Sequence, residues 1–287
     1  MEFLRALLQG VIIGIANVIP GVSGGTMMVS MGVYDTLIGC ITGLFRHFGK
    51  SVKTLLPYAL GMLAGIVALA SVLTYLFANY PLPTSTAFIG LILGGVSPLL
   101  KKIDLKNVNG LSMLLFLAFL ALIVVMAVMN PQEKSISVNF SVVQALVLLA
   151  VGVIASATMI VPGVSGSMVL MLLGYYQTVL KAVTDLKDGL LGGNLPLALQ
   201  QLEILVPFGV GVLIGIYAVA KLIEWLIRRY PVYTYSAILG LVVASPVAVL
   251  LRCDMTGATP VIVLISLVTF IAGYVASAWL AKRAKTS

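Results

Sequence analysis

The sequence predicts an all-α polytopic membrane protein with two inverted-topology repeats of about five hydrophobic segments each. Three observations predict this fold class: the apolar composition, a duplicated Pro-Gly motif and the placement of the basic residues. Apolar residues make up 61% of the 287 residues, charged residues only 9%, and the mean hydropathy is +1.15. A soluble protein of this length needs far more charge to cover its surface, so there is little room for a soluble domain.

Apolar segments of membrane-spanning length recur along the whole chain, and we count about ten. They occupy residues 4–19, 25–45, 54–78, 84–100, 111–129, 140–161, 167–183, 204–227, 233–251 and 259–280. Five segments fall in each half of the chain. Because five is odd, the two halves are expected to have opposite orientations in the membrane.

The first interruption of the apolar pattern is the sequence PGVSGGT at residues 20–26. Proline has no amide hydrogen and glycine permits unusual backbone angles, so we expect the helix to break here. Broken backbone at membrane depth is tolerated only where it is buried in protein or lines a wet cavity. A helix that restarts near Ser23 leaves its first amides unpaired, and these amides with the Ser23 and Thr26 hydroxyls suit an anion.

The same motif returns as PGVSG at residues 162–166, so that Pro20 and Pro162 are 142 residues apart. Later matches, such as 80–81 with 230–231, are 150 residues apart and place an eight-residue insertion within 184–201. We therefore expect a first inverted repeat at 1–135 and a second at 136–287. Each repeat would contain a broken or re-entrant helix hairpin, and together they would form one transmembrane domain.

Basic residues gather in the loops that would share one side of the membrane. They are Arg5, Arg46, Lys50, Lys53, Lys101, Lys102, Lys106, Arg228, Arg229, Lys282, Arg283 and Lys285. This positive-inside pattern predicts a multi-pass protein with both termini cytoplasmic. The glycine pairs Gly10 with Gly14, Gly61 with Gly65 and Gly211 with Gly215 have small-xxx-small spacing, which predicts close helix packing and no ligand role.

Candidate substrate-binding residues surround the two motifs. They are Asn17, Ser23, Gly24, Gly25, Thr26, Ser165, Gly166 and Ser167. The second copy has Ser167 and Met168 where the first has Gly25 and Thr26, so the two copies are expected to differ in polarity. The alternatives are a helix kink or close packing for the motifs and an interhelical hydrogen bond for Asn17.

Three charged residues are further candidates. A carboxylate at membrane depth is a functional hypothesis by default, so Asp35 either carries a coupling proton or pairs with a cation. The alternative is that Asp35 lies near the cytoplasmic end of its segment and meets water. Arg5 and Arg252 either contact a lipid head group or act only as orientation and interface anchors.

The sequence offers no chemistry for an enzyme, and no metal or cofactor is expected. His47 is the only histidine, and no paired carboxylates or nucleophile elbow occur. The sequence GKS at 49–51 lacks the glycine spacing and preceding strand of an ATP-binding loop. The net charge of +8 follows from the membrane loops, so no nucleic-acid partner is expected.

The chain resembles the bacterial PopT family of polyprenyl-phosphate transporters. The resemblance rests on NVIPGVSGGT at 17–26 with GVYD at 32–35, and on VPGVSGS at 161–167 with GYY at 174–176. It implies recycling of undecaprenyl phosphate, the lipid carrier of cell-wall precursors, from the outer to the inner leaflet of the plasma membrane. The family pattern has an acidic residue after the tyrosine in each repeat; Asp35 fits it and Gln177 departs from it.

The leading hypothesis is therefore a lipid-phosphate flippase in which a midplane pocket holds the head group while the isoprenoid tail stays in the bilayer. A secondary transporter of a small soluble anion, built on the same motifs, is the alternative, and a membrane-embedded lipid phosphatase is the third. The sequence leaves the coupling ion, proton or sodium, and the oligomeric state open.

Overall fold

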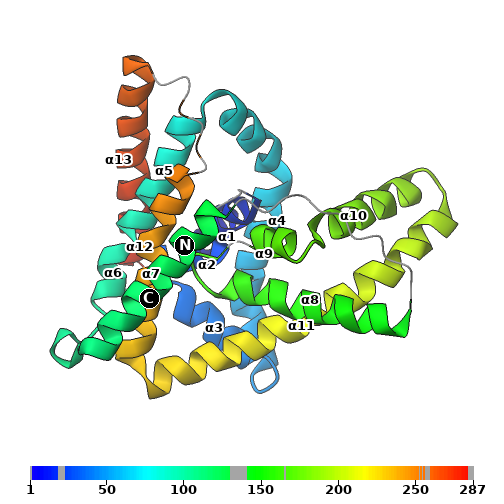
Figure 1. Cartoon of the computed structure of the whole chain (residues 1–287), viewed down its shortest axis with the longest axis horizontal. Coiled ribbons are helices and arrows are strands. Elements are labelled where there is room, and N and C mark those ends of the chain that lie inside the picture. Colours follow the sequence, from blue (N-terminus) through cyan, green and yellow to red (C-terminus); the bar gives the residue numbers. More distant parts are fainter. Residues whose placement is uncertain are drawn as a thin grey trace. The chain divides into compact units, whose positions relative to one another are not determined.

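The computed structural model describes residues 2–18, 23–129, 141–164, 166–251, 253, 255 and 259–283, and these residues form helices and connecting turns without a strand (Figure 1). Among them, five helices are long and apolar enough to cross a membrane. They are α7 (Gly110–Val128), α8 (Val142–Ile160), α11 (Leu195–Arg229), α12 (Pro231–Leu251) and the stretch Pro260–Trp279 of α13 (Pro260–Arg283). The predicted class, an all-helical multi-pass membrane protein, is confirmed.

The chain divides into two compact units. The larger unit comprises Met1–Met129, Val161–Val164 and Ala220–Ser287, and the smaller unit comprises Asn130–Ile160 and Ser165–Val219. These units are defined by packing, whereas the predicted repeats 1–135 and 136–287 are defined by sequence similarity. The repeat boundary and the inverted orientation of the repeats remain predictions.

The larger unit contains most of the helices. They are α1 (Glu2–Val18), α2 (Gly24–Ser30), α3 (Tyr34–Thr42), α4 (Phe48–Asn79), α5 (Pro81–Gly94), α6 (Val96–Leu100), the 3-10 helix η1 (Leu105–Asn107), α7, the end of α11, α12 and α13. The smaller unit contains α8, α9 (Gly166–Leu172), α10 (Tyr176–Leu191) and most of α11.

The helix ends at both motifs agree with the predicted breaks. At the first motif, α1 ends at Val18, Ser23 has extended backbone (φ −110°, ψ 131°) and α2 begins at Gly24. Pro20 and Gly21 lie outside the described residues. At the second motif, α8 ends at Ile160 and α9 begins six residues later. Whether either broken pair re-enters the membrane from its own side remains a prediction.

A second break follows each motif, so that each of the apolar segments 25–45 and 167–183 contains two helices. Gly32 and Gly174 have positive φ angles of 70° and 79°. After each glycine the chain closes a Schellman motif, in which the Val33 amide donates to the Met28 carbonyl at 3.0 Å. The equivalent bond of the second copy measures 2.9 Å. A residue in the left-handed region ends a helix, which explains both breaks.

Glycines bring α1 into direct backbone contact with α4, and α8 with α11, as the glycine spacing predicted. A Cβ atom on Gly10 would lie 2.3 Å from the Tyr58 carbonyl oxygen, and one on Gly14 would lie 2.3 Å from that of Met62. Because both contacts have the same sequence offset, α1 and α4 run parallel and begin on the same side. In the smaller unit, Gly211 and Gly215 place α11 parallel to α8 in the same way.

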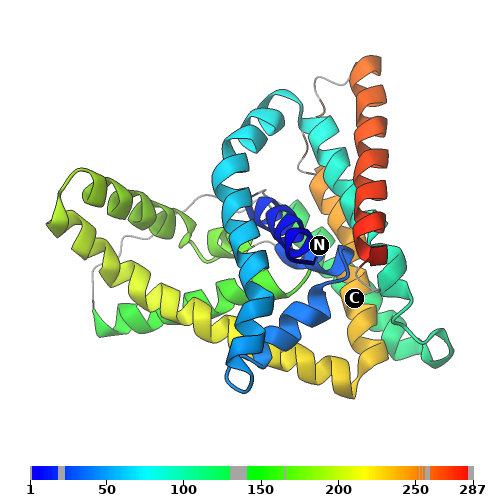
Figure 2. The same cartoon turned by 180° about the vertical axis from the view of Figure 1, so that it is seen from behind.

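Two further pairs, α5 with α13 and α7 with α12, join helices from opposite halves of the sequence. A Cβ atom on Gly90 of α5 would lie 2.1 Å from the Phe270 carbonyl of α13, and one on Gly94 would lie 2.5 Å from the Tyr274 carbonyl. Likewise, a Cβ atom on Gly240 of α12 would lie 2.3 Å from the Phe116 carbonyl of α7. Figure 1 and the reverse view in Figure 2 show α13 alongside α5. Thus α5 and α7 each pack on a helix more than 100 residues later in the chain.

Candidate functional site

The short helix α2, which follows the first motif, is buried along its whole length. The Ser30 hydroxyl donates a hydrogen bond to the Ile92 carbonyl of α5 at 3.2 Å. A Cβ atom on Gly95 would lie 2.0 Å from the Cα atom of Ser30, so the turn after α5 closes directly on the end of α2. The first motif therefore continues into a helix that lies in the interior of the larger unit, where broken backbone is tolerated.

Ser23 is the most informative residue of the first motif. Its side chain is 4% exposed, it does not cap α2, and its Oγ has no hydrogen-bond partner among the described residues. A buried polar group without a partner costs about 1–3 kcal/mol. By helix geometry, the first amides of α2 also have no acceptor within the helix. The site thus combines a buried hydroxyl with backbone donors.

The side chain of Asn17 lies against Gly24, the residue that follows Ser23. A Cβ atom on Gly24 would lie 2.5 Å from the Asn17 Oδ1 atom, so any larger residue at 24 would displace the Asn17 carboxamide. The second copy shows the same relation within the smaller unit, where a Cβ atom on Gly166 would lie 2.9 Å from the Thr158 Oγ1 atom. The glycine that begins each short helix therefore leaves room for a polar side chain of the preceding helix.

Thr26 connects the two motifs. Its side chain is fully buried, and its Oγ1 accepts a hydrogen bond from the Gly163 amide at 2.6 Å. Gly163 has a φ of +81°, and a Cβ atom there would lie 2.8 Å from the Leu241 carbonyl of α12. The turn 161–164 belongs to the larger unit, so this contact lies within one compact unit. The Thr26 hydroxyl, predicted only as a ligand group, thus forms a structural hydrogen bond with the turn 161–164.

The remaining predicted residues are placed only in part. Ser165 and Arg252 lie outside the described residues, and so does the side chain of Ser167. Gly166 is the first residue of α9, and Gly25 is a buried residue of α2. The ligand roles of all these residues remain predictions.

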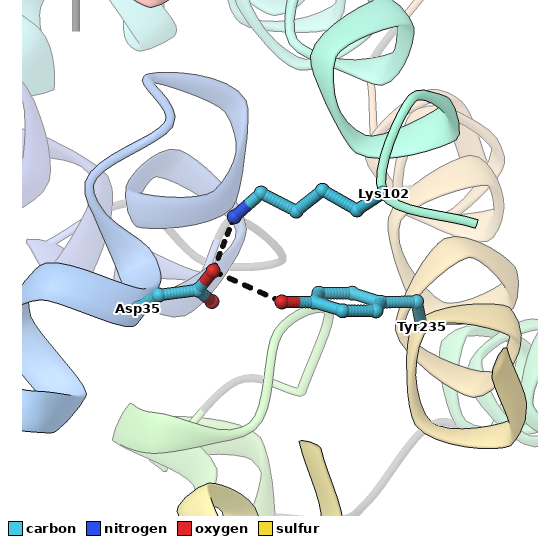
Figure 3. A network of polar contacts seen from close by, with 3 residues as sticks. All are labelled: Asp35, Lys102 and Tyr235. Atoms are coloured by element: carbon cyan, nitrogen blue, oxygen red, sulfur yellow. Dashed lines mark hydrogen bonds and ion pairs between the residues drawn. The ribbon is translucent and has the colours of Figure 1, made fainter. Parts of the chain in front are cut away.

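Asp35 is the centre of a network that joins three segments (Figure 3). It lies in the first turn of α3, where its Oδ2 pairs with the Lys102 ammonium and accepts a hydrogen bond from the Tyr235 hydroxyl at 2.9 Å. The Lys102 ammonium also lies 5.5 Å from the centroid of the Tyr235 ring, a cation–π arrangement. The side chains of Lys102 and Asp35 are 31% and 39% exposed. Of the alternatives for Asp35, the structure shows pairing with a cation, Lys102.

Sequence reasoning missed two members of this network. Lys102 had been considered only as an orientation signal, and Tyr235 had not been singled out. A tyrosine inside an apolar segment was the available signal for Tyr235, but nothing local indicated that it faces Asp35, 200 residues earlier.

The network encloses a small cavity with unsatisfied polar atoms. Tyr34, Asp35, Lys102 and Tyr235 line a cavity of about 10 Å³, close to the space of one water molecule. The Tyr34 side chain is 2% exposed, and neither its hydroxyl nor Asp35 Oδ1 has a partner among the described residues. One donor and one acceptor without partners thus belong to residues that line a space of this size, which a single small polar group can fill.

A larger cavity lies at the beginnings of α1 and α4 and has a volume of about 530 Å³. Its lining includes Arg5 and Lys53 but no carboxylate among the described residues. Arg5, predicted to contact a lipid head group or to anchor the interface, thus lines a cavity together with a second cation. Within the described ranges, no cluster of three His, Cys, Asp or Glu side chains could hold a metal ion.

Comparisons with known proteins agree with the motif resemblance. The family model described as undecaprenyl phosphate translocase-like matches residues 13–260. The polyprenyl-phosphate transporter of Vibrio cholerae is 33% identical over an alignment covering 85% of this chain and 77% of that protein. The transporter of the same name from Staphylococcus aureus is 32% identical over 94% of this chain and 93% of that protein. No solved structure matches the chain.

The family match spans both motifs and extends from α1 to the first residue of α13. Both relatives exceed 30% identity and align over most of their own length. The chain therefore belongs to the undecaprenyl phosphate translocase-like family.

Proposed function

We propose that this protein is a polyprenyl-phosphate transporter that moves undecaprenyl phosphate from the outer to the inner leaflet of the plasma membrane, returning the carrier lipid for cell-wall synthesis. Family membership and the names of the two relatives support the substrate class. The helices that are long and apolar enough to cross a membrane support a location in the bilayer.

The physical problem for such a transporter is the head group. A phosphate monoester carries about −1.5 to −2 charges near neutral pH. Moving that charge through hydrocarbon without compensation is prohibitively costly, so the protein must offer polar groups inside the membrane. The observation that carries the proposal is the Ser23 hydroxyl, which is buried and has no partner among the described residues.

In the proposed site, Ser23 and Thr26 contact the phosphate together with the amides of Gly24 and Gly25, and Asn17 supports them from the end of α1. By the sequence repeat, we assign the same role to Ser165, Gly166 and Ser167. The proposed architecture is two inverted repeats that alternate access around the broken helices, with both termini cytoplasmic. The parallel packing of α1 and α4 supports this topology, because it puts their beginnings on one side.

Asp35 is the proposed coupling residue. A proton or a sodium ion that neutralises its carboxylate would release the Lys102 ammonium from its present partner. The released ammonium could then compensate the phosphate charge nearby. The ion pair would thus keep the charge of Lys102 neutralised when no substrate is bound.

The proposal is tested in proteoliposomes containing a fluorescent polyprenyl phosphate, with transport measured as loss of the label's accessibility to an external quencher. We expect Ser23→Ala to reduce the rate at least tenfold, because loss of a hydrogen bond to a charged group costs about 1.5–3 kcal/mol. The matched control is Ser266→Ala, which removes a buried hydroxyl that bonds the Ile262 carbonyl within its own helix at 2.7 Å.

Two further measurements separate the alternatives. Uptake of a soluble anion without lipid movement would support the secondary anion transporter. Release of inorganic phosphate from the lipid by purified protein would support a phosphatase. Wild-type lipid transport by a well-folded Ser23→Ala protein would refute the proposed site.

A further inference from the structure

The 530 Å³ cavity is an open pocket of the larger unit, and no residue of the two motifs lines it. It is lined by Phe3, Arg5, Ala6, Gln9, Gly32, Val33, Thr36, Lys53, Thr54, Pro57 and Tyr58. These residues come from the first turns of α1, the early part of α4, the turn between α2 and α3, and the start of α3. None of the substrate-binding residues predicted around the two motifs belongs to this lining.

Helix packing explains where the cavity lies. The lining residues of α1 and α4 end at Gln9 and Tyr58, just before the glycine contact that joins the two helices. There, a Cβ atom on Gly61 would lie 2.1 Å from the Leu7 carbonyl and one on Gly10 would lie 2.3 Å from the Tyr58 carbonyl. The cavity therefore lies on the side of this contact where the two helices begin.

The charge of the lining selects for an anion. Arg5 and Lys53 are its charged residues, and no carboxylate belongs to it among the described residues. Two cations match the charge of about −1.5 to −2 on a phosphate monoester. A cavity lined by one sign of charge concentrates ions of the opposite sign, because its low-dielectric walls focus the field.

Gln9 supplies an independent observation that points to a ligand. Its side chain is 1% exposed, and its Oε1 accepts a hydrogen bond from the Tyr58 hydroxyl at 3.3 Å. The Nε2 group has no acceptor among the described residues. A buried donor without a partner is unfavourable, and an acceptor oxygen entering the cavity would satisfy it.

The lining also has an apolar portion that suits the start of a prenyl chain. Phe3 is 57% exposed, and Ala6 and Pro57 contribute further apolar surface. A lining that combines cationic and amide donors with apolar groups matches a phosphate ester of a hydrophobic alcohol. The same donors also suit free phosphate, so the shared chemistry is the phosphate monoester dianion.

We propose that this cavity is a second phosphate-binding site, in which Arg5, Lys53 and Gln9 hold the head group on the side where α1 and α4 begin. As a lipid site it rests on the proposed function and would be the place where the head group docks before release or after entry. By the basic-residue pattern, that side is cytoplasmic. Binding itself does not depend on transport, so the two proposals can fail separately.

The test measures binding of farnesyl phosphate to the full-length purified protein by calorimetry. All variants are made in the Ser23→Ala background, so that the motif site contributes little. We expect Arg5→Gln and Lys53→Gln each to weaken binding about tenfold, because each removes a charge-assisted contact. Gln9→Glu should weaken binding at least as much, because it replaces the donor by a negative charge while keeping the acceptor for Tyr58.

Lys50→Gln is the matched control, because it removes the same charge from an exposed position of the same helix outside the lining. It should bind like the parent, and Arg5→Lys should recover most of the affinity. Thermal midpoints without ligand exclude variants that fail to fold, and Lys53, which is exposed, tolerates substitution best. Farnesol should not bind.

Inorganic phosphate distinguishes the two sources of the ligand. If it binds as tightly as farnesyl phosphate and farnesol does not compete, the site serves free phosphate; if it binds at least tenfold more weakly, the site serves the lipid. Two results would overturn the proposal: parental affinity in both Arg5→Gln and Lys53→Gln, or an equal loss in Lys50→Gln. Loss of transport in Ser23→Ala with retained cavity binding supports both sites, and unchanged transport with retained binding refutes only the motif site.

Discussion

Gly90→Ala is predicted to destabilise the protein through the contact between α5 and α13. The added Cβ atom would lie 2.1 Å from the Phe270 carbonyl oxygen, whereas ordinary van der Waals contact begins at 3.4 Å. The neighbouring atom belongs to the backbone, so no side-chain rotation relieves the clash. The two helices must move apart by up to 1.3 Å, the difference between these distances, which also loosens the contact at Gly94.

The magnitude follows from two opposing terms. Overpacking a tight contact costs about 1–3 kcal/mol. Alanine is favoured over glycine inside a helix by about 1 kcal/mol, which offsets part of that cost. We expect Gly90→Ala to lower the free energy of unfolding by up to about 2 kcal/mol. At Gly209 of α11, no atom apart from its chain neighbours and the backbone of its own helix lies within 4 Å of the Cβ position. Gly209→Ala should therefore leave stability unchanged or raise it.

The assay is denaturant unfolding in mixed micelles followed by circular dichroism, with both variants measured beside the parent. The informative quantity is the difference between two identical substitutions at a crowded and an open glycine. Equal free energies of unfolding for Gly90→Ala and Gly209→Ala would refute the argument that backbone contact through glycine holds α5 to α13.

Two further predictions concern the polar contacts. Thr26→Val removes the acceptor for the buried Gly163 amide and should destabilise the fold by about 1–3 kcal/mol in the same unfolding assay, while Thr26→Ser should stay near the parent. Equal stability of the two variants would contradict a role for that hydrogen bond. For Asp35 and Lys102, both about one third exposed, a double-mutant cycle with Asp35→Asn and Lys102→Met should give a coupling of about 0.2–1 kcal/mol that shrinks with salt. A coupling that is insensitive to salt would show that the pair is shielded from solvent.

The parts of the fold that depend on local chemistry were predictable from the sequence. Proline followed by glycines gave the ends of α1 and α8, and glycine spacing gave the close packing of α1 on α4. The break at Gly32 was missed, because one glycine and the short polar stretch after it do not clearly interrupt a long apolar segment, whereas the positive φ of Gly32 ends α2. The repeat of Gly32 at Gly174, with tyrosine two residues later, was the signal available.

The candidate site was predictable only where it coincides with the motif. Ser23 and Thr26 were found because they belong to a short conspicuous sequence, but the bond from Gly163 to Thr26 joins residues 137 positions apart. The network of Asp35, Lys102 and Tyr235 depends on how α3, the turn after α6 and α12 pack together. Pairing over such separations is set by tertiary structure, and one sequence carries no direct signal of it.

The pairing of α5 with α13 and of α7 with α12 has a consequence for how the protein is made. A fragment that stopped near residue 135 would leave the glycine face of α5 and the packing face of α7 bare, since their partners, α13 and α12, are synthesised last. Until α12 and α13 are synthesised, these faces of α5 and α7 would contact lipid or a second copy of the chain. The first half of the chain therefore depends on the last two helices to cover α5 and α7.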